Sequence, residues 1–262
     1  MNTRPMTVLV VGATGSIGQL VVAGAIRQGY ATRALVRDPD TARQLPREAH
    51  LAVADITRPD TLPAAVAGVD AVVFTHGSRG AGKTGMENVD YGAVRNILTA
   101  LGSSPARIAL MTAIGVTNRT GPYNRSTAAH DWKRRSERLV RASGRPYTIV
   151  RPGWFDYNGP DEQRLVFLQG DRRQAGDASD GVIARRQIAQ VLLGSLGSQA
   201  ADHKTFELVA EHGPAPENLD PLFAALDQDP PKALDGVHDT SNRPIDDEPQ
   251  RVREALHVLA AN

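Results

Sequence analysis

Three glycines near the amino terminus have the spacing and surroundings of a phosphate-binding turn. Gly12, Gly15 and Gly18 follow an apolar run at residues 8–11, and an apolar helical pattern continues to Ile26. A strand that turns into a helix in this way brings backbone N–H groups and the positive end of the helix dipole to a pyrophosphate. A turn that merely joins strand to helix is the alternative. We predict a dinucleotide site whose contacts include Gly12, Thr14, Gly15, Ser16, Ile17 and Gly18.

The residue that ends the second expected strand bears on the choice between NADP and NAD. Arg37 lies nineteen residues after Gly18, where an acidic residue would hold the ribose hydroxyls of NAD. An arginine can instead form paired charge-assisted hydrogen bonds to the 2′-phosphate of NADP. We therefore expect NADP. NAD is the less favoured alternative, because the adjacent Asp38 could bind the ribose or merely cap the next turn.

The ends of the next two strands supply the remaining contacts expected for a dinucleotide. Asp55 and Ile56 follow the third strand, where Asp55 could meet the adenine amino group or serve as an ordinary turn residue. Thr75, His76 and Gly77 end the fourth strand and would border the second ribose.

The overall composition excludes several kinds of chemistry. The 262 residues carry a formal net charge of +1, which gives no reason to expect nucleic acid or an anionic membrane as a partner. There is no cysteine, so disulfides, thiolate metal ligands and cysteine nucleophiles are excluded, and we expect no metal site. No apolar stretch approaches the roughly 18–20 residues of a membrane span and no signal-peptide pattern is present, so we expect a cytoplasmic protein.

Strand and helix patterns alternate over about the first 150 residues. Short apolar runs typical of buried strands lie at residues 7–11, 32–36, 51–53, 71–75, 108–111 and 148–150. Helical patterns lie between them at residues 15–28, 61–67, 87–101 and 129–142. This alternation predicts the α/β class, as a doubly wound parallel sheet (Rossmann fold) with right-handed crossovers.

The pattern loosens after residue 151, where prolines and polar residues become frequent. A helix is expected at residues 186–196, a strand at 205–209, and helices at 218–226 and 248–260. We predict a single NAD(P)-binding domain over residues 1–262. Residues 152–262 would contribute a small substrate-side lobe over the carboxyl ends of the strands, and a polar C-terminal tail.

Several segments together carry a likeness to a known family. They are residues 12–18, 35–38, 54–56, 88–96, 133–137 and 147–153. In these segments the chain resembles the atypical members of the short-chain dehydrogenase/reductase superfamily, in the NAD(P)H-binding branch that includes NmrA-like proteins. The likeness covers roughly residues 7–210 and implies a Rossmann fold and a nicotinamide cofactor, but it does not settle the reaction.

The resemblance implies catalysis by serine, tyrosine and lysine, and this chain keeps only part of that set. Lys133 matches the lysine, which would hold the nicotinamide ribose, but Ala129 stands where the tyrosine would be. The serine position falls on Thr112 or Ala113. Tyr123, in the loop before the helix, could supply the missing proton donor or simply pack in the loop.

Two further groups of residues border the expected active site. His130 and Asp131 flank the vacated tyrosine position but would point away from Lys133 on a helix, so we expect surface or capping roles for them. Aromatic side chains follow the sixth strand and could line an apolar substrate pocket or pack under the C-terminal lobe; they are Trp154, Phe155 and Tyr157.

The segment at residues 77–84, GSRGAGKT, matches the phosphate loop of nucleoside triphosphatases letter for letter. That loop normally opens a helix at once, yet Gly85 follows here and the helical pattern starts only near Glu87. No later apolar strand ends in an aspartate suited to magnesium. We therefore expect a glycine-rich loop that closes over bound cofactor.

The favoured hypothesis is an NADP(H)-dependent oxidoreductase that moves hydride between nicotinamide and a small organic substrate. Without a tyrosine acid, an acceptor that needs little proton assistance fits best, such as a quinone or an activated olefin. The alternative is a non-catalytic, NmrA-like NADP(H) sensor that offers the polar tail at residues 211–247 to a protein partner. An epimerase or dehydratase is a third hypothesis, and a homodimer is left open.

Overall fold

The computed structural model describes residues 4–78 and 80–261. One sheet runs in the order β3-β2-β1-β4-β5-β6-β10-β9-β7, and β8 also pairs with β10. The strand order reverses between β1 and β4, which are direct neighbours, so this is the point where an open α/β sheet leaves a crevice at its carboxyl edge. The parallel strands are β1 (Thr7–Val11), β2 (Ala31–Val36), β3 (His50–Val53), β4 (Ala71–Phe74), β5 (Arg107–Met111), β6 (Tyr147–Pro152) and β10 (Lys204–Glu211). The predicted doubly wound sheet is confirmed.

Both faces of the central strands are buried, which is why their sequences are continuous apolar runs rather than alternating ones. In β1, Val8 and Val10 belong to the core on one face of the sheet. Leu9 and Val11 belong to the core on the other face. The alternation of side chains along a strand thus divides one short run between two apolar layers.

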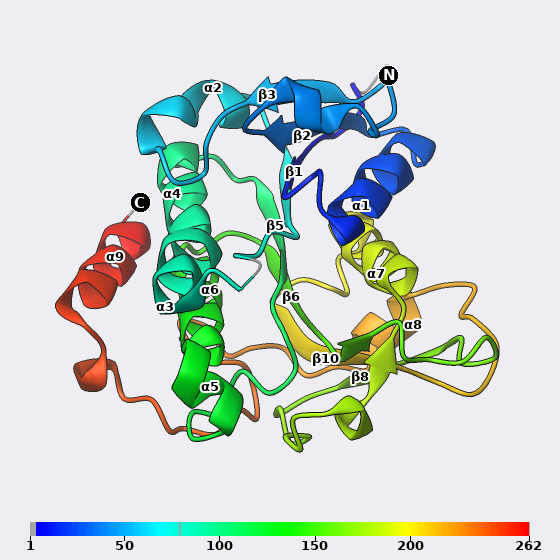
Figure 1. The fold of residues 1–262 in the computed structure, drawn as a ribbon, viewed down its shortest axis with the longest axis vertical. Helices are drawn as coiled ribbons and strands as arrows, with labels where there is room; N and C mark the ends of the chain where they lie inside the picture. Colours follow the sequence, from blue (N-terminus) through cyan, green and yellow to red (C-terminus); the bar gives the residue numbers. More distant parts are fainter. Residues whose placement is uncertain (1–3, 79, 262) are drawn as a thin grey trace.

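Helices cover the two faces of the sheet (Figure 1). On one side, α1 (Ser16–Arg27) packs against α7 (Arg185–Gly197). On the other side, α4 (Gly92–Leu101) packs against α6 (Ala129–Ala142), and α9 (Gln250–Ala260) lies against both. The shorter helices are α2 (Pro63–Val66), α3 (Gly82–Gly85), α5 (Pro122–Thr127) and α8 (Asp220–Ala224). Among the described residues, no helix is long and apolar enough to span a membrane.

The structure departs from the predicted elements mainly in short segments. The helix expected at residues 87–101 begins as a π-helical turn, Met86–Tyr91, before it continues as α4. After β6 the chain adds β7 (Trp154–Phe155), β8 (Arg164–Leu168) and β9 (Val182–Ile183) to the sheet edge. β7 and β9 have only two residues each, too few for a periodic pattern, whereas β8 has an apolar run, Leu165–Leu168, that is not among the strands expected from the sequence.

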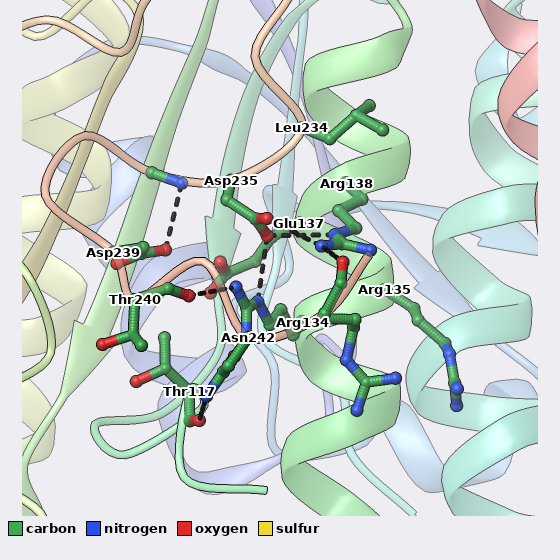
Figure 2. Close-up of polar contacts among 12 residues, drawn as sticks. Thr117, Arg134, Arg135, Glu137, Arg138, Leu234, Asp235, Asp239, Thr240 and Asn242 are labelled. Atoms are coloured by element: carbon green, nitrogen blue, oxygen red, sulfur yellow. Dashed lines mark hydrogen bonds and ion pairs between the residues drawn. The ribbon is translucent and has the colours of Figure 1, made fainter. Parts of the chain in front are cut away.

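A C-terminal strap, residues 227–248, crosses α6 and is held by buried ion pairs. Figure 2 shows the Asp235 carboxylate between two α6 guanidiniums, those of Arg134 and Arg138. Asp235 Oδ1 accepts from Arg134 Nε at 2.9 Å, and Oδ2 accepts from Arg138 Nη2 at 2.7 Å. Glu248 likewise accepts from Arg135 Nε at 2.7 Å and from Arg138 Nη1 at 3.0 Å.

The strap directs part of the charge of the polar tail inward, and a contact between the tail and a protein partner stays a prediction. Arg134 and Arg138 are almost fully buried, and so is Glu248. Isolated charges are costly to bury, so the arginines of α6 and the acids of the strap satisfy one another. These polar residues therefore form an internal layer between α6 and the strap.

Candidate cofactor and substrate site

The glycine turn after β1 has the close backbone approaches that a pyrophosphate cradle needs. Gly15 N–H donates to Gly12 O at 2.9 Å, which closes the turn. Gly12 has a φ of +87°, and a Cβ there would lie 2.7 Å from the backbone nitrogen of His76. A Cβ at Gly18 would lie 2.0 Å from Gly12 O. Only glycine fits these two positions, because any side chain would collide with backbone.

The first turn of α1 is open to an anion. Its N-cap, Gly15, offers no side-chain cap, and no acidic residue lies in that turn. Free N–H groups and the helix dipole therefore face the turn, while Ile17 is buried and anchors the helix to the core. Ser16 is exposed and Thr14 half-buried beside it. These residues fit a dinucleotide pyrophosphate.

The ends of β2 and β3 present an arginine and an aspartate at the same side of the crevice. Arg37 is exposed, whereas Asp38 Oδ1 accepts from Asp40 N at 2.9 Å and so caps the next turn. Asp55 Oδ1 accepts from the backbone N–H and the hydroxyl of Thr57, at 2.8 and 2.7 Å. Partial burial would raise the pKa of Asp55, but these hydrogen bonds and the nearby Arg37 charge hold it below its usual value.

The end of β4 brings together a lysine, an aspartate and a histidine. Lys133 Nζ donates to Asp90 Oδ1 at 2.7 Å, in a pair where Asp90 is almost fully buried. Desolvation would raise the pKa of Asp90, but the Lys133 ammonium lowers it overall. Asp90 Oδ2 also accepts from Ser78 N, at 3.0 Å. Lys133 therefore stands at the predicted edge of the site with one of its three N–H donors occupied.

His76 lies just after the carboxyl end of β4, next to the Lys133–Asp90 pair. Its Nε2 donates to Asp90 O at 3.2 Å, which assigns the proton to Nε2 in the neutral ring. Burial lowers the pKa of His76, so the ring is uncharged near pH 7. Its Nδ1 is a buried acceptor with no hydrogen-bond donor among the described residues. Thr75, one residue earlier, donates its hydroxyl to Val11 O at 3.1 Å and so ties β4 to β1.

Thr112, at the serine position implied by the resemblance, hydrogen-bonds to a buried acid. Its hydroxyl donates to Glu137 Oε1 at 2.7 Å inside the protein. Arg151 completes this cluster, with Nε and Nη2 at 3.0 and 2.7 Å from the two oxygens of Glu137. Burial would lower the pKa of Arg151, but the surrounding carboxylates raise it well above its usual value. The Thr112 proton is thus engaged in a buried ion-pair cluster, and a catalytic role for this residue stays a prediction.

Tyr123 and His130 lie together beside the vacated tyrosine position. Tyr123 is on α5, more than half exposed, with its ring centroid 5.3 Å from that of His130. His130, for which we expected a surface or capping role, is half-buried in the first turn of α6, and its Nδ1 lies 3.4 Å from Asn118 O. Burial lowers the pKa of His130. The structure shows no contact between Tyr123 and Lys133 that would make the tyrosine a proton donor.

The three aromatic residues after β6 lie at the edge of the sheet. Trp154 and Tyr157 are exposed, with ring centroids 6.4 Å apart. Phe155 is half-buried, and the Arg185 guanidinium carbon lies 5.4 Å from its ring centroid. None of these three residues contributes to the lining of the two cavities described below, one beside α4 and one beside the loop after β5. They form an exposed aromatic group, and a role in substrate binding stays a prediction.

The phosphate-loop look-alike folds as a short exposed segment. Residues 82–85 form the single-turn helix α3, with Lys83 exposed, and Arg79 of the motif lies outside the described residues. The glycine turn at Gly12 and the start of α1, rather than this loop, lie at the switch point of the sheet. Thr84 and Gly85 instead line a cavity of about 590 Å³ together with Thr57 and the start of α4.

The parallel sheet, its switch point and the open glycine turn define a Rossmann dinucleotide-binding protein. A family described as NAD(P)H-binding matches residues 12–199. The chain therefore belongs to this NAD(P)H-binding family.

Individual proteins show how far the similarity extends. A Bacillus subtilis (strain 168) protein described as an uncharacterised sugar epimerase, YhfK, is 30% identical over 83% of this chain and 100% of its own length. Sanguinarine reductase of Eschscholzia californica is 24% identical over 86% of this chain and 97% of its own. A solved Bacillus halodurans structure, classed provisionally as an NAD-dependent epimerase/dehydratase, aligns with a TM-score of 0.70 at 22% identity, over 84% of this chain and 100% of that one.

Sequence reasoning missed the acids that hold the basic residues of the site. Asp90 lies inside one of the segments that carry the family likeness, yet its position in a π-helical turn opposite Lys133 is not visible in a helical stripe. Glu207 on β10, described below, is an acid in the middle of a buried strand. Such an acid is itself a signal, because a charge there needs a partner or a function.

Proposed function

We propose that this protein is an NADP(H)-dependent reductase whose acceptor needs little proton assistance. The observation that carries the proposal is the pairing of an uncapped α1 amino terminus with the exposed Arg37 at the end of β2. The first suits a pyrophosphate and the second a 2′-phosphate. Asp38, which could have held the ribose of NAD, is engaged with Asp40 instead.

Lys133 and His76 give the inner end of the site its polar groups. Lys133 keeps two N–H donors beyond its bond to Asp90, so it can still hold ribose hydroxyls. The buried Nδ1 of His76 can accept a hydrogen bond from a bound molecule. Bound NADPH supplies the hydride, and these residues bind and orient it.

Among the residues that the structure describes, none is placed as a general acid in this site, which limits the acceptor. Ala129 replaces the tyrosine, the Thr112 proton is committed to Glu137, and His130 is uncharged near pH 7. Quinones and activated olefins accept hydride with the charge spread over a conjugated system, so they depend least on proton donation by the protein. The reductase name of one relative agrees with such a reaction, and we do not favour the sensor alternative.

Titration of the purified protein with NADPH and NADH, followed by nicotinamide fluorescence, tests the cofactor half of the proposal. Arg37→Gln should weaken NADPH binding by about 10–100-fold, the worth of one or two charge-assisted bonds, and leave NADH binding unchanged. Arg43→Gln is the matched control, because Arg43 is an exposed arginine just beyond the same strand, paired only with the exposed Asp40 among the described residues. Equal losses for the two variants would assign the effect to net charge and refute the role of Arg37.

Acceptor-dependent NADPH oxidation tests the catalytic half. We expect turnover with 1,4-naphthoquinone or cyclohex-2-enone and none with cyclohexanone, which needs a proton donor. Tight NADPH binding without oxidation by any of these acceptors would reject the reductase and return the sensor to first place.

A further inference from the structure

A second cavity lies beside the carboxyl end of β5, on the substrate side of the expected nicotinamide position. It encloses about 300 Å³ and is lined by Ile114, Leu168, Gln169, Arg172, Arg173 and Glu207. Ile114 belongs to the loop that follows β5 and hydrogen-bonds through its backbone to Pro152 at the end of β6. The cavity therefore opens where the sheet of a Rossmann protein meets its substrate.

The walls of this cavity are held in place by the surrounding chain. Gln169 donates to Thr205 O and Asp227 O, each at 3.0 Å, and accepts from Asp227 N at 2.9 Å. Asp171 accepts from Gly115 N at 2.6 Å and from Thr117 N at 2.7 Å, so the turn after β8 is clamped to the loop after β5. The cavity is thus a built feature that joins three distant segments.

Two guanidinium groups on the cavity wall lack strong partners. Arg172 is exposed, and it forms no ion pair with any carboxylate in the part of the chain that the structure describes. The carboxylate found near Arg173 is that of Glu211, 3.8 Å away in an exposed pair. Adjacent, weakly paired arginines on one cavity are a suitable receptor for a carboxylate, which they can bind through parallel N–H···O bonds.

The floor of the cavity is the buried carboxyl of Glu207. Its Oε1 accepts from Arg151 Nη1 at 3.2 Å, and its Oε2 accepts from Asp171 N at 3.0 Å. Burial raises the pKa of Glu207 to about 7, because the nearby Asp171 and Asp239 carboxylates offset part of the attraction of Arg151. Glu207 is therefore largely neutral in mildly acidic solution and gains a charge as the pH rises.

We propose that this cavity is the subsite for a carboxylate on the substrate, bound by Arg172 and Arg173 over the floor formed by Glu207. The assignment of the bound acid as the hydride acceptor rests on the proposed function, whereas its binding here does not. The substrate class is then a small unsaturated or quinoid acid whose conjugated part reaches the nicotinamide past Ile114.

Calorimetric titration with cinnamate and with cinnamamide, its neutral isostere, tests the subsite without any cofactor. We expect cinnamate to bind about tenfold or more tightly than cinnamamide, and each of Arg172→Gln and Arg173→Gln to remove about fivefold to tenfold of its affinity. Arg253→Gln is the matched control, because Arg253 is an exposed arginine on α9. The proposal would be overturned by any of three results. Cinnamate and cinnamamide could bind with equal affinity, all three variants could lose the same affinity, or similar concentrations of any anion could displace cinnamate from the site.

The pH dependence of cinnamate binding tests the role of Glu207 independently. Cinnamate stays ionised between pH 6 and 8, so its affinity should rise severalfold as the pH falls through the Glu207 pKa of about 7 and the repelling charge is lost. Glu207→Gln should bind cinnamate at pH 8 as tightly as the unchanged protein does at pH 6, with no dependence on pH. A pH dependence that persists in Glu207→Gln would exclude this carboxyl as its source.

The reductase proposal and the carboxylate-subsite proposal can be refuted separately. Arg172→Gln should retain NADPH affinity, since the residue lies outside the cofactor cradle, and should raise the KM for cinnamate-like acceptors more than it lowers kcat. If no acceptor is reduced but cinnamate still binds with the expected variant pattern, the reductase fails and the subsite stands. If neutral quinones are reduced and cinnamate does not bind, the reductase stands and the subsite fails.

Discussion

Removal of the charge on Asp235 is the sharpest test of how the C-terminal strap is held. In Asp235→Asn the side chain keeps its size, but Arg134 and Arg138 lose the carboxylate that pairs with both of them. The two guanidiniums are 0% and 2% exposed, so water cannot replace the lost charge. We therefore expect a cost well above that of a surface pair.

The magnitude follows from the pKa of the carboxyl itself. Burial acts to raise the pKa of Asp235, but the bonds and charges of the two arginines lower it from 3.8 to about 2. That difference corresponds to about 2.5 kcal/mol of folding free energy. Because the folded pKa lies below the unfolded one, the stabilisation is present above about pH 4 and is lost as the pH falls towards 2. Asp235→Asn should therefore lose about 2–3 kcal/mol at pH 7.

Urea denaturation at pH 7, followed by circular dichroism, measures this loss. Asp60→Asn is the control, because Asp60 and Arg58 form a 3.0 Å pair whose side chains are about two-thirds exposed. Such a pair contributes roughly 0–1 kcal/mol. Losses within about 0.5 kcal/mol of each other would refute the argument that burial makes the strap pairs strong.

Three further predictions concern the site. Gly12→Ala should weaken NADPH binding by about 10–100-fold in a fluorescence titration, because the added methyl group meets the backbone at the end of β4. Gly29→Ala is the control: Gly29 has a similar positive φ but open space around it, so this variant should lose about 1–2 kcal/mol of stability and no NADPH affinity. Thr112→Val should lower the free energy of unfolding by about 1–3 kcal/mol, because Glu137 loses a buried donor, while kcat changes little. A large fall in kcat at unchanged stability would instead support a catalytic role for Thr112. Lys133→Met should weaken NADPH binding by about tenfold, and an unchanged affinity would confine the lysine to its buried ion pair.

The strands and helices of the doubly wound sheet were predictable because each is encoded in a local stretch of sequence. Residues 7–11 and the helix at 129–142 form over the predicted ranges, since a buried strand needs an unbroken apolar run and a packed helix needs its stripe. The strap was not predictable. An arginine-rich helix ordinarily faces water, and nothing local in the α6 sequence shows that acids about a hundred residues later will cover it.

The site was predictable only in part, for the same reason. The glycine turn is local, and its geometry agrees with the spacing of Gly12, Gly15 and Gly18. The hydroxyl of Thr112 could bind substrate or a neighbouring side chain, and its contact with Glu137, twenty-five residues away, is not visible in the local sequence. Sequence reasoning names the residue types at a site, whereas hydrogen bonds between distant segments determine which atoms stay available to a ligand.

The wide spacing of the strap contacts along the chain has a consequence for how the protein is made. Arg134 meets Asp235 across 101 residues, and Arg135 meets Glu248 across 113. On a ribosome the arginines of α6 emerge long before their acids, so the dinucleotide-binding half cannot bury this helix face until the chain has been synthesised past Glu248. Contacts of such high sequence separation close late and slowly. A message cut short before codon 235 would also lack α9, whose Val252, Leu256 and Leu259 belong to the core on this side of the sheet, so it would yield a chain with exposed apolar surface that is prone to aggregate, rather than a trimmed but working binding domain.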